Sequence, residues 1–322
     1  MQIGSFIEME FQKGKEYYNG NNIARLNSGR AGIYHAARVK GCDTVYLPYY
    51  LCDTVRDFLI KKQVQVRYYS INERFEPLIK TIPRNTAIVI TNYYGIMSQK
   101  RLRTFSNNFE NIIIDNAQAF FCKPVEGCLN VYSARKFIGV PDGSYVIGPD
   151  VERYIEDYQQ DYSSDTSQFL LQRVEYGCEG KAYDARMLNE HRIDTSDIKK
   201  MSKLTHAILD GTNYEFIIKK RKENFDIACQ LLNGINNLDV RMHYDDYCVP
   251  MVYPLVVEND ALLSKLLNKH IFQGHWWSYL LNEVDESSFE YYMSRYLIPI
   301  TIDQRYGRLE LEYTHNIIEQ SP

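Results

Sequence analysis

Short apolar runs alternate with helical patterns of apolar residues through the first half of the chain. Four runs rich in Val, Ile and Tyr predict buried strands, at 45–47, 64–69, 87–91 and 112–114. Apolar residues recur at helical spacing in the intervening segments 31–39, 54–62 and 99–107. This alternation is typical of an α/β domain with a mainly parallel sheet.

The second half of the pattern predicts a separate, smaller unit. Two further strands, 131–133 and 144–147, are followed by a polar stretch, 152–200, in which no function is evident. A long helical pattern over 213–232 ends at Gly234 and leads into a strand at 252–257 and helices near 261–269 and 308–319. We therefore expect a large α/β domain over residues 1–235 and a small C-terminal α+β domain over 236–322.

Composition and charge exclude some classes of function. The 322 residues are 45% hydrophobic, which is enough for a sizeable core, and the formal net charge is -4. The most basic run, 219–222, lies in a helical pattern and is interpreted as a solvated face. Because a duplex-binding protein usually needs a basic surface, we expect no nucleic-acid partner.

The chain start and the cysteines point to a reduced compartment. No apolar stretch approaches the roughly 20 residues that cross a bilayer, and the first residues lack the pattern of a signal peptide. The seven Cys are odd in number and scattered, without the spacing of a zinc site. We expect a cytoplasmic protein with no membrane partner and no metal.

Candidate chemistry is sought where parallel strands end, because ligands bind beyond the carboxyl ends of such strands. Asn27-Ser28-Gly29-Arg30 opens the first helix, and free N–H groups at a helix start suit a phosphate. Gly29 lets a ligand approach the backbone closely. The alternative is that Ser28 only caps the helix.

A second candidate, Asp115, ends the apolar strand at 112–114. Burial raises the pKa of a carboxyl group unless a cation offsets it, and a protonated pyridine nitrogen is such a cation. The alternative is that Asp115 caps the following turn.

The third candidate is Lys136, in the segment Ser133-Ala134-Arg135-Lys136. Its apolar neighbours Phe137 and Ile138, together with the charge of Arg135, would favour the neutral amine that Schiff-base chemistry needs. Ser133 and Arg135 are within reach of a phosphate in this interpretation. The alternative is an ordinary surface lysine.

Taken in this order, the three motifs resemble the DegT/DnrJ/EryC1/StrS aminotransferases, which use pyridoxal 5′-phosphate (PLP), adopt fold type I and mostly act on nucleotide-linked keto sugars. The resemblance covers about residues 22–318. It extends to a strand ending in Pro at 45–50, an Asn-Tyr-Tyr-Gly turn at 92–95 and a Leu-Ile-Pro segment at 296–300.

The resemblance implies a role for each matching residue. Lys136 would form the internal aldimine and carry protons, Asp115 would pair with the pyridinium nitrogen, and Gln118 would lie near the ring. Residues implied at the phosphate are Ser28, Gly29, Arg30 (through its backbone) and Ser133. Tyr50 and Tyr94 would form the wall of the site, and Cys52 stands where the family has an aromatic residue that stacks on the ring.

Other features separate this chain from the family pattern. Lys136 follows Ser133 by three residues where five are common, and the family's Gly-Tyr-Asn motif is not visible before Met201. Family sites lie at a subunit interface, so a homodimer is implied. His275 and Trp276, in the segment that contains both Trp residues, match the stretch that approaches substrate; the alternative is a packed aromatic cluster.

These observations favour a PLP-dependent aminotransferase that moves an amino group from an amino-acid donor to a keto sugar, nucleotide-linked in the family. One alternative is a PLP-dependent lyase or dehydratase, which would use the same electron sink; Lys136 argues against the dehydratase branch, which replaces it. Another is a non-catalytic relative that binds PLP or a sugar nucleotide.

Overall fold

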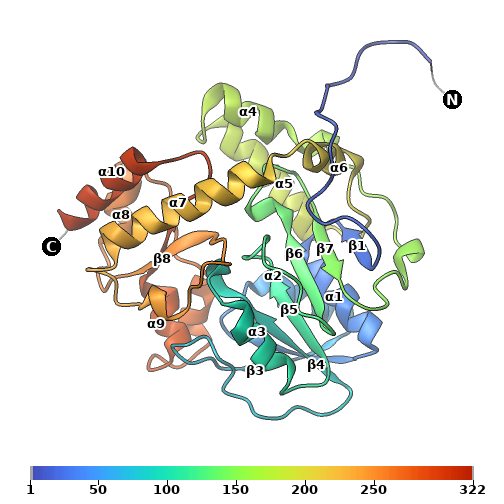
Figure 1. The fold of residues 1–322 in the computed structure, drawn as a ribbon, viewed down its shortest axis with the longest axis horizontal. Coiled ribbons are helices and arrows are strands. Elements are labelled where there is room, and N and C mark those ends of the chain that lie inside the picture. The colour runs from blue at the N-terminus through green and yellow to red at the C-terminus, as the bar shows by residue number, and fades with distance from the viewer. Residues whose placement is uncertain (1–2, 321–322) are drawn as a thin grey trace.

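The computed structural model describes residues 3–320 and has a seven-stranded sheet at its centre (Figure 1). The strand order is β1-β7-β6-β5-β4-β2-β3, and β2 to β6 pair in parallel, whereas β7 runs antiparallel to both β6 and β1. The predicted mainly parallel sheet is confirmed. The strands are β1 Ile23–Leu26, β2 Thr44–Pro48, β3 Gln65–Tyr69, β4 Thr86–Thr91, β5 Ile112–Asn116, β6 Leu129–Ser133 and β7 Ser144–Ile147.

Alternate residues of the central strands face two different cores. Ala87, Val89 and Ile113 belong to a core shared with helices α1 (Gly29–Lys40) and α2 (Asp53–Lys61). Ile88 and Ile114 face the opposite core, which includes α3 (Gln99–Ser106) and much of the C-terminal half of the chain. Because both faces of these strands are covered, their sequences read as continuous apolar runs rather than alternating ones.

The last part of the chain contributes a small unit, which is a second, two-stranded sheet with helices around it. Its two strands, β8 (Val252–Val256) and β9 (Leu297–Thr301), pair antiparallel. The long helix α7 (Tyr214–Leu232) leads into this unit, and Tyr253 and Leu255 join the core on the second face of the large sheet. The proposed boundary near residue 236 stays a prediction. The other helices are α8 Leu262–Asn268, α9 Phe289–Tyr296 and α10 Arg308–Glu319.

The polar stretch that had no clear pattern folds largely into helices. It contains α4 (Gln168–Tyr176) and α5 (Lys181–Thr195), which pack against each other as a hairpin, and it is followed by α6 (Lys203–Asp210) (Figure 1). No residue of α4 is buried. Within residues 3–320 no helix is long and apolar enough to cross a membrane.

Gly95 allows the turn after β4 to approach two other parts of the chain. Its φ is +71°, and a Cβ atom there would lie 2.7 Å from the carbonyl oxygen of Gln118 and 2.9 Å from that of Val249. Both neighbours are backbone, so neither can rotate away. The residue therefore joins the large sheet to the segment that leads into β8.

Replacement of Gly95 by Ala is expected to lower the free energy of unfolding by about 2–4 kcal/mol, because backbone strain and overpacking add. Urea denaturation measures the loss. Gly127→Ala is the matched control, since Gly127 has a φ of +78° but nothing within 4 Å of its added Cβ. Equal losses in the two variants would show that the close approach at Gly95 contributes nothing beyond strain.

Candidate active site

The predicted site residues come from the carboxyl ends of neighbouring parallel strands. Tyr50 follows β2, Tyr94 follows β4, Asp115 lies near the end of β5, and Lys136 follows β6. These ends meet at one edge of the sheet, since β2, β4, β5 and β6 are adjacent and parallel. The start of α1 lies at the same edge of the sheet, where Gly29 is next to Ser133.

The start of α1 and the end of β6 form a small polar cradle. Ser28 caps α1, its Oγ accepting a hydrogen bond from the Ala31 backbone N–H at 3.3 Å. A Cβ atom added to Gly29 would lie 4.0 Å from the Cβ of Ser133, and both serines are buried. Free N–H groups at a helix start, with hydroxyls beside them, match the donors that a phosphate group needs.

Arg30 contributes to this cradle through its backbone alone. Its guanidinium group forms an ion pair with Asp194 of α5 at 2.5 Å. The side chain is therefore committed to α5, in keeping with the prediction that only the backbone of Arg30 would face a phosphate.

Asp115 is a buried carboxylate with one uncommitted oxygen. Burial raises its pKa, and this effect is opposed by the Ala117 N–H and by the positive charge of Lys136. Oδ1 accepts from Ala117 at 2.9 Å, so the expected turn-capping role is present, while Oδ2 has no hydrogen-bond partner among residues 3–320. A cation beside Oδ2 would satisfy the carboxylate that burial disfavours.

Gln118 and two tyrosines form a buried hydrogen-bonded chain next to Asp115. The Gln118 Oε1 accepts from the Tyr94 backbone N–H at 2.8 Å, and the hydroxyls of Tyr94 and Tyr50 are 3.0 Å apart. Burial raises the pKa of both tyrosines, so they are neutral at physiological pH. This chain fixes Gln118 and the turn after β4 relative to one another.

The two tryptophans of the small unit cover the same region. Trp277 packs edge-on against Tyr50 with ring centroids 4.4 Å apart, and Trp276 lies 5.6 Å from Tyr94. The Lys136 Nζ is 5.8 Å from the centroid of the Trp276 ring. His275 faces β9 instead, with its Nδ1 2.9 Å from the Leu297 carbonyl oxygen. Two alternatives were open for this segment: a packed aromatic cluster, or a stretch that approaches the site. Trp276 does both.

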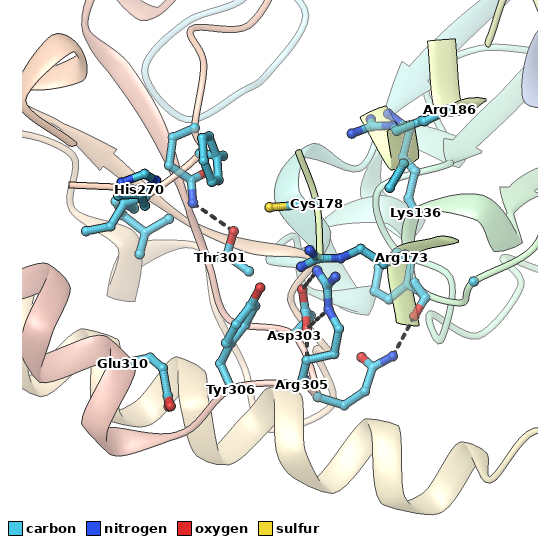
Figure 2. A pocket seen from close by; sticks show the side chains of 18 of the residues that line it. Lys136, Arg173, Cys178, Arg186, His270, Thr301, Asp303, Arg305, Tyr306 and Glu310 are labelled. Atoms are coloured by element: carbon cyan, nitrogen blue, oxygen red, sulfur yellow. Dashed lines mark hydrogen bonds and ion pairs between the residues drawn. The ribbon is translucent and has the colours of Figure 1, made fainter. Parts of the chain in front are cut away.

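A cavity of about 740 Å³ opens beside Lys136, between the large sheet, the α4–α5 hairpin and the small unit (Figure 2). Lys136 also lines a neighbouring cavity of about 460 Å³, together with Trp276 and Trp277. The wall of the larger cavity contains more basic than acidic residues. The acidic residues are Asp303 and Glu310, and the Lys and Arg residues are Arg135, Lys136, Arg173, Arg186, Arg221, Lys269 and Arg305. The cavity thus suits an anionic ligand.

Sequence reasoning missed most of this basic wall. Arg173 and Arg186 lie in the segment that showed no clear pattern, and Arg305 follows β9. The interpretation of 219–222 as a solvated face is wrong for Arg221, which is only 2% exposed. The signal available was its helical register with the apolar residues Ile217 and Phe225.

One expectation about local environment differs from the structure, and another agrees with it. Lys136 is exposed, so the expected desolvation by Phe137 and Ile138 is wrong, although both of these side chains are themselves buried. Cys52 is half-buried at the start of α2, where its Sγ lies 3.1 Å from the Thr54 Oγ1. No ring contact accompanies Cys52, which agrees with the departure from the family's stacking position.

Comparison with known proteins identifies the fold. The sequence matches no protein-family model and no curated protein. Three solved structures superpose along nearly the whole chain, each with low sequence identity. The sugar aminotransferase CalS13 from Micromonospora echinospora is 16% identical, with a TM-score of 0.62, and the match covers 94% of this chain and 88% of that one.

The second is a DegT DnrJ EryC1 StrS aminotransferase from Brucella abortus, 11% identical over 92% of this chain and 85% of that one, with a TM-score of 0.62. The third is NtdA from Bacillus subtilis with bound cofactor PMP (pyridoxamine phosphate), 12% identical over 92% and 73%, with a TM-score of 0.60. The fold is that of these aminotransferases, as the resemblance in the sequence implied.

Proposed function

We propose that the protein is a PLP-dependent aminotransferase that moves an amino group from an amino-acid donor to a nucleotide-linked keto sugar. The observation that carries the proposal is the pairing of Asp115 and Lys136. A buried carboxylate with a free oxygen lies within electrostatic range of a lysine at the adjacent strand end. In this fold, the carboxylate would pair with the ring nitrogen of pyridoxal, and the lysine would bond to the aldehyde carbon at the opposite end of the ring.

The residues fit the cofactor in three places. Ser28, the N–H groups from Gly29 onward and Ser133 would hold the phosphate, and the free Oδ2 of Asp115 would accept from the ring nitrogen. Lys136 would hold the cofactor covalently. When bound, PLP supplies an electron sink for the carbon next to the reacting nitrogen.

The chain's own residues would carry out the remaining steps. Asp115 keeps a proton on the ring nitrogen through its negative charge, and Lys136 moves a proton at the reacting carbon of the substrate. Trp276 and Trp277 exclude water from the side of the small unit. The basic cavity beside Lys136 supports a phosphate-bearing acceptor, which is why we favour a nucleotide-linked sugar.

A homodimer in the cytoplasm completes the proposal. Apolar side chains stand exposed along the α4–α5 hairpin, which supports a subunit contact there, and all seven cysteines are unpaired, which supports a reducing compartment. A protomer mass in sedimentation equilibrium would contradict the dimer. The exposed residues are Leu171, Val174, Tyr176, Tyr183, Met187 and Leu188.

Absorption spectroscopy of the PLP-loaded protein tests the reaction. Adding L-glutamate or L-glutamine is expected to replace the visible band of the lysine-bound cofactor by the near-ultraviolet band of pyridoxamine phosphate. A keto sugar should then restore the visible band. Release of ammonia or a keto product with no pyridoxamine phosphate would instead favour elimination. The absence of any cofactor band would favour a non-catalytic relative.

A further inference from the structure

Arg221 is a buried cation on α7 that forms no ion pair with any residue of the described range 3–320. It is 2% exposed, and its guanidinium carbon lies 4.5 Å from the centre of the Phe137 ring. Nη1 donates to the carbonyl oxygens of Met251 at 2.8 Å and Pro250 at 3.3 Å. Arg221 and Lys136 line the same two cavities, which places Arg221 near the candidate catalytic lysine.

The positive charge of Arg221 is incompletely balanced. Burial lowers its pKa to about 10, with Asp303 opposing this effect, so the side chain is still protonated at neutral pH. Asp303 is itself engaged by Arg305 through two hydrogen bonds, at 2.9 Å and 2.6 Å. A buried charge without a close partner is costly, and a ligand of opposite charge would remove that cost.

One edge of the guanidinium group is free. Nε is buried without a hydrogen-bond partner, and Nη2 also has none among the described residues. Nε and Nη2 lie side by side on the planar group, in the arrangement that binds both oxygens of a carboxylate. The opposite nitrogen, Nη1, is the one fixed by backbone carbonyls, so the orientation of the free edge is set.

The free edge belongs to a residue that lines the space in front of Lys136. Arg221 lines both the larger and the smaller cavity, as do Lys136 and Thr301. Other cations of the wall, such as Lys269, are exposed and therefore stabilise an anion less. An anion bound by Arg221 would lie between the small unit and Lys136.

We propose that Arg221 binds the carboxylate of the amino donor and so determines specificity for amino acids over simple amines. This inference rests on the proposed aminotransferase function. A carboxylate is favoured over a phosphate because Nε is buried, and a planar carboxylate needs less room beside it than a tetrahedral phosphate. The competing explanation is that Arg221 only holds the segment before β8 in place, through Pro250 and Met251.

Calorimetric titration of the PLP-loaded protein with glutarate tests the binding site without turnover. We expect Arg221→Gln to weaken glutarate binding about tenfold or more, because a charge-assisted pair of hydrogen bonds is lost. Arg221→Lys should lose several-fold, since one ammonium group cannot reproduce the two-nitrogen edge. Lys219→Gln, which removes an exposed charge from the same helix outside both cavities, should stay within about twofold of the wild type.

The outcomes separate the alternatives. Wild-type affinity for glutarate in Arg221→Lys, or in a folded Arg221→Gln, would overturn the proposal and leave a structural role. Tighter binding of inorganic phosphate than of glutarate, lost in the same variants, would also overturn it. Circular dichroism checks folding, and if Arg221→Gln does not fold, Arg221→Lys decides.

Stopped-flow measurement of pyridoxamine phosphate formation gives an independent readout. With L-glutamate, Arg221→Lys should raise the donor concentration at half-maximal rate about tenfold and change the keto-sugar half-reaction little. A wild type that binds glutarate but never forms pyridoxamine phosphate would refute the proposed function rather than this anion site. A wild type that forms it, with an unchanged donor dependence in Arg221→Lys, would refute the role of Arg221.

Discussion

The protein with Lys136→Ala is expected to bind PLP without a covalent bond and to lose at least about 10³-fold in turnover. The substitution removes both the covalent attachment and the group that moves the proton at the substrate carbon. Absorption before and after borohydride treatment measures the first effect: reduction should fix the cofactor to the wild-type chain and leave the variant free of it.

Lys136→Arg is the control for charge. It keeps a cation near Asp115 and Trp276 but cannot form the covalent bond, because the guanidinium group stays protonated. We expect it to be as inactive as the Ala variant. Borohydride fixation of PLP in either variant would mean that another lysine holds the cofactor and that Lys136 has been wrongly assigned.

Asp115→Asn is expected to lower turnover by about 10²- to 10³-fold, because the ring nitrogen would lose the negative charge that keeps it protonated. The amide oxygen can still accept from the Ala117 N–H, so the local turn should persist. The half-reaction with an amino donor measures the effect on the cofactor directly.

The same variant should have the opposite effect on stability when PLP is absent. Burial raises the pKa of Asp115, so its ionisation disfavours the folded state, and this cost is present at neutral pH and vanishes as the pH falls below the usual carboxyl range. The Asn variant lacks this cost. Its cofactor-free form should therefore melt no lower than the wild type near pH 7.

Asp142→Asn provides a matched comparison for Asp115→Asn. Asp142 is also buried, with its pKa raised by burial, but its Oδ1 accepts from the Ser202 backbone N–H and its other oxygen lies 3.6 Å from Arg192. We expect this variant to change stability without a selective loss in the donor half-reaction. A loss as large as that of Asp115→Asn would mean that the two carboxylates act through folding alone.

The ends of the central strands could be predicted because each follows an uninterrupted run of apolar residues. Ile112 to Ile114 has no interpretation other than a buried segment, and Asp115 follows it directly, near the carboxyl end of β5. β1 was missed, since Ile23–Leu26 is short and includes Arg25, and its pairing with β7 depends on a segment more than a hundred residues away. Local patterns carry no information about such a partner.

The basic cavity was beyond sequence reasoning for the same reason. Arg173, Arg221 and Arg305 come from three segments that only the tertiary fold brings together. Arg221 was hidden further by its three Lys neighbours in the chain, Lys219, Lys220 and Lys222, none of which is buried. The composition of this run suggests a uniformly exposed basic surface. Only the helical period shows that Arg221 faces inward while its lysine neighbours do not.

The backbone around residue 251 restricts how the small unit can move against the large sheet. The Met251 N–H donates to the Tyr94 carbonyl oxygen at 2.8 Å, and the Met251 carbonyl accepts from Arg221. A hinge rotation of the small unit away from the sheet would break the Met251–Tyr94 bond and pull on the turn that holds Gln118. Movement of the small unit against the sheet is therefore opposed by the same backbone segment that orients Gln118 on one side and Arg221 on the other.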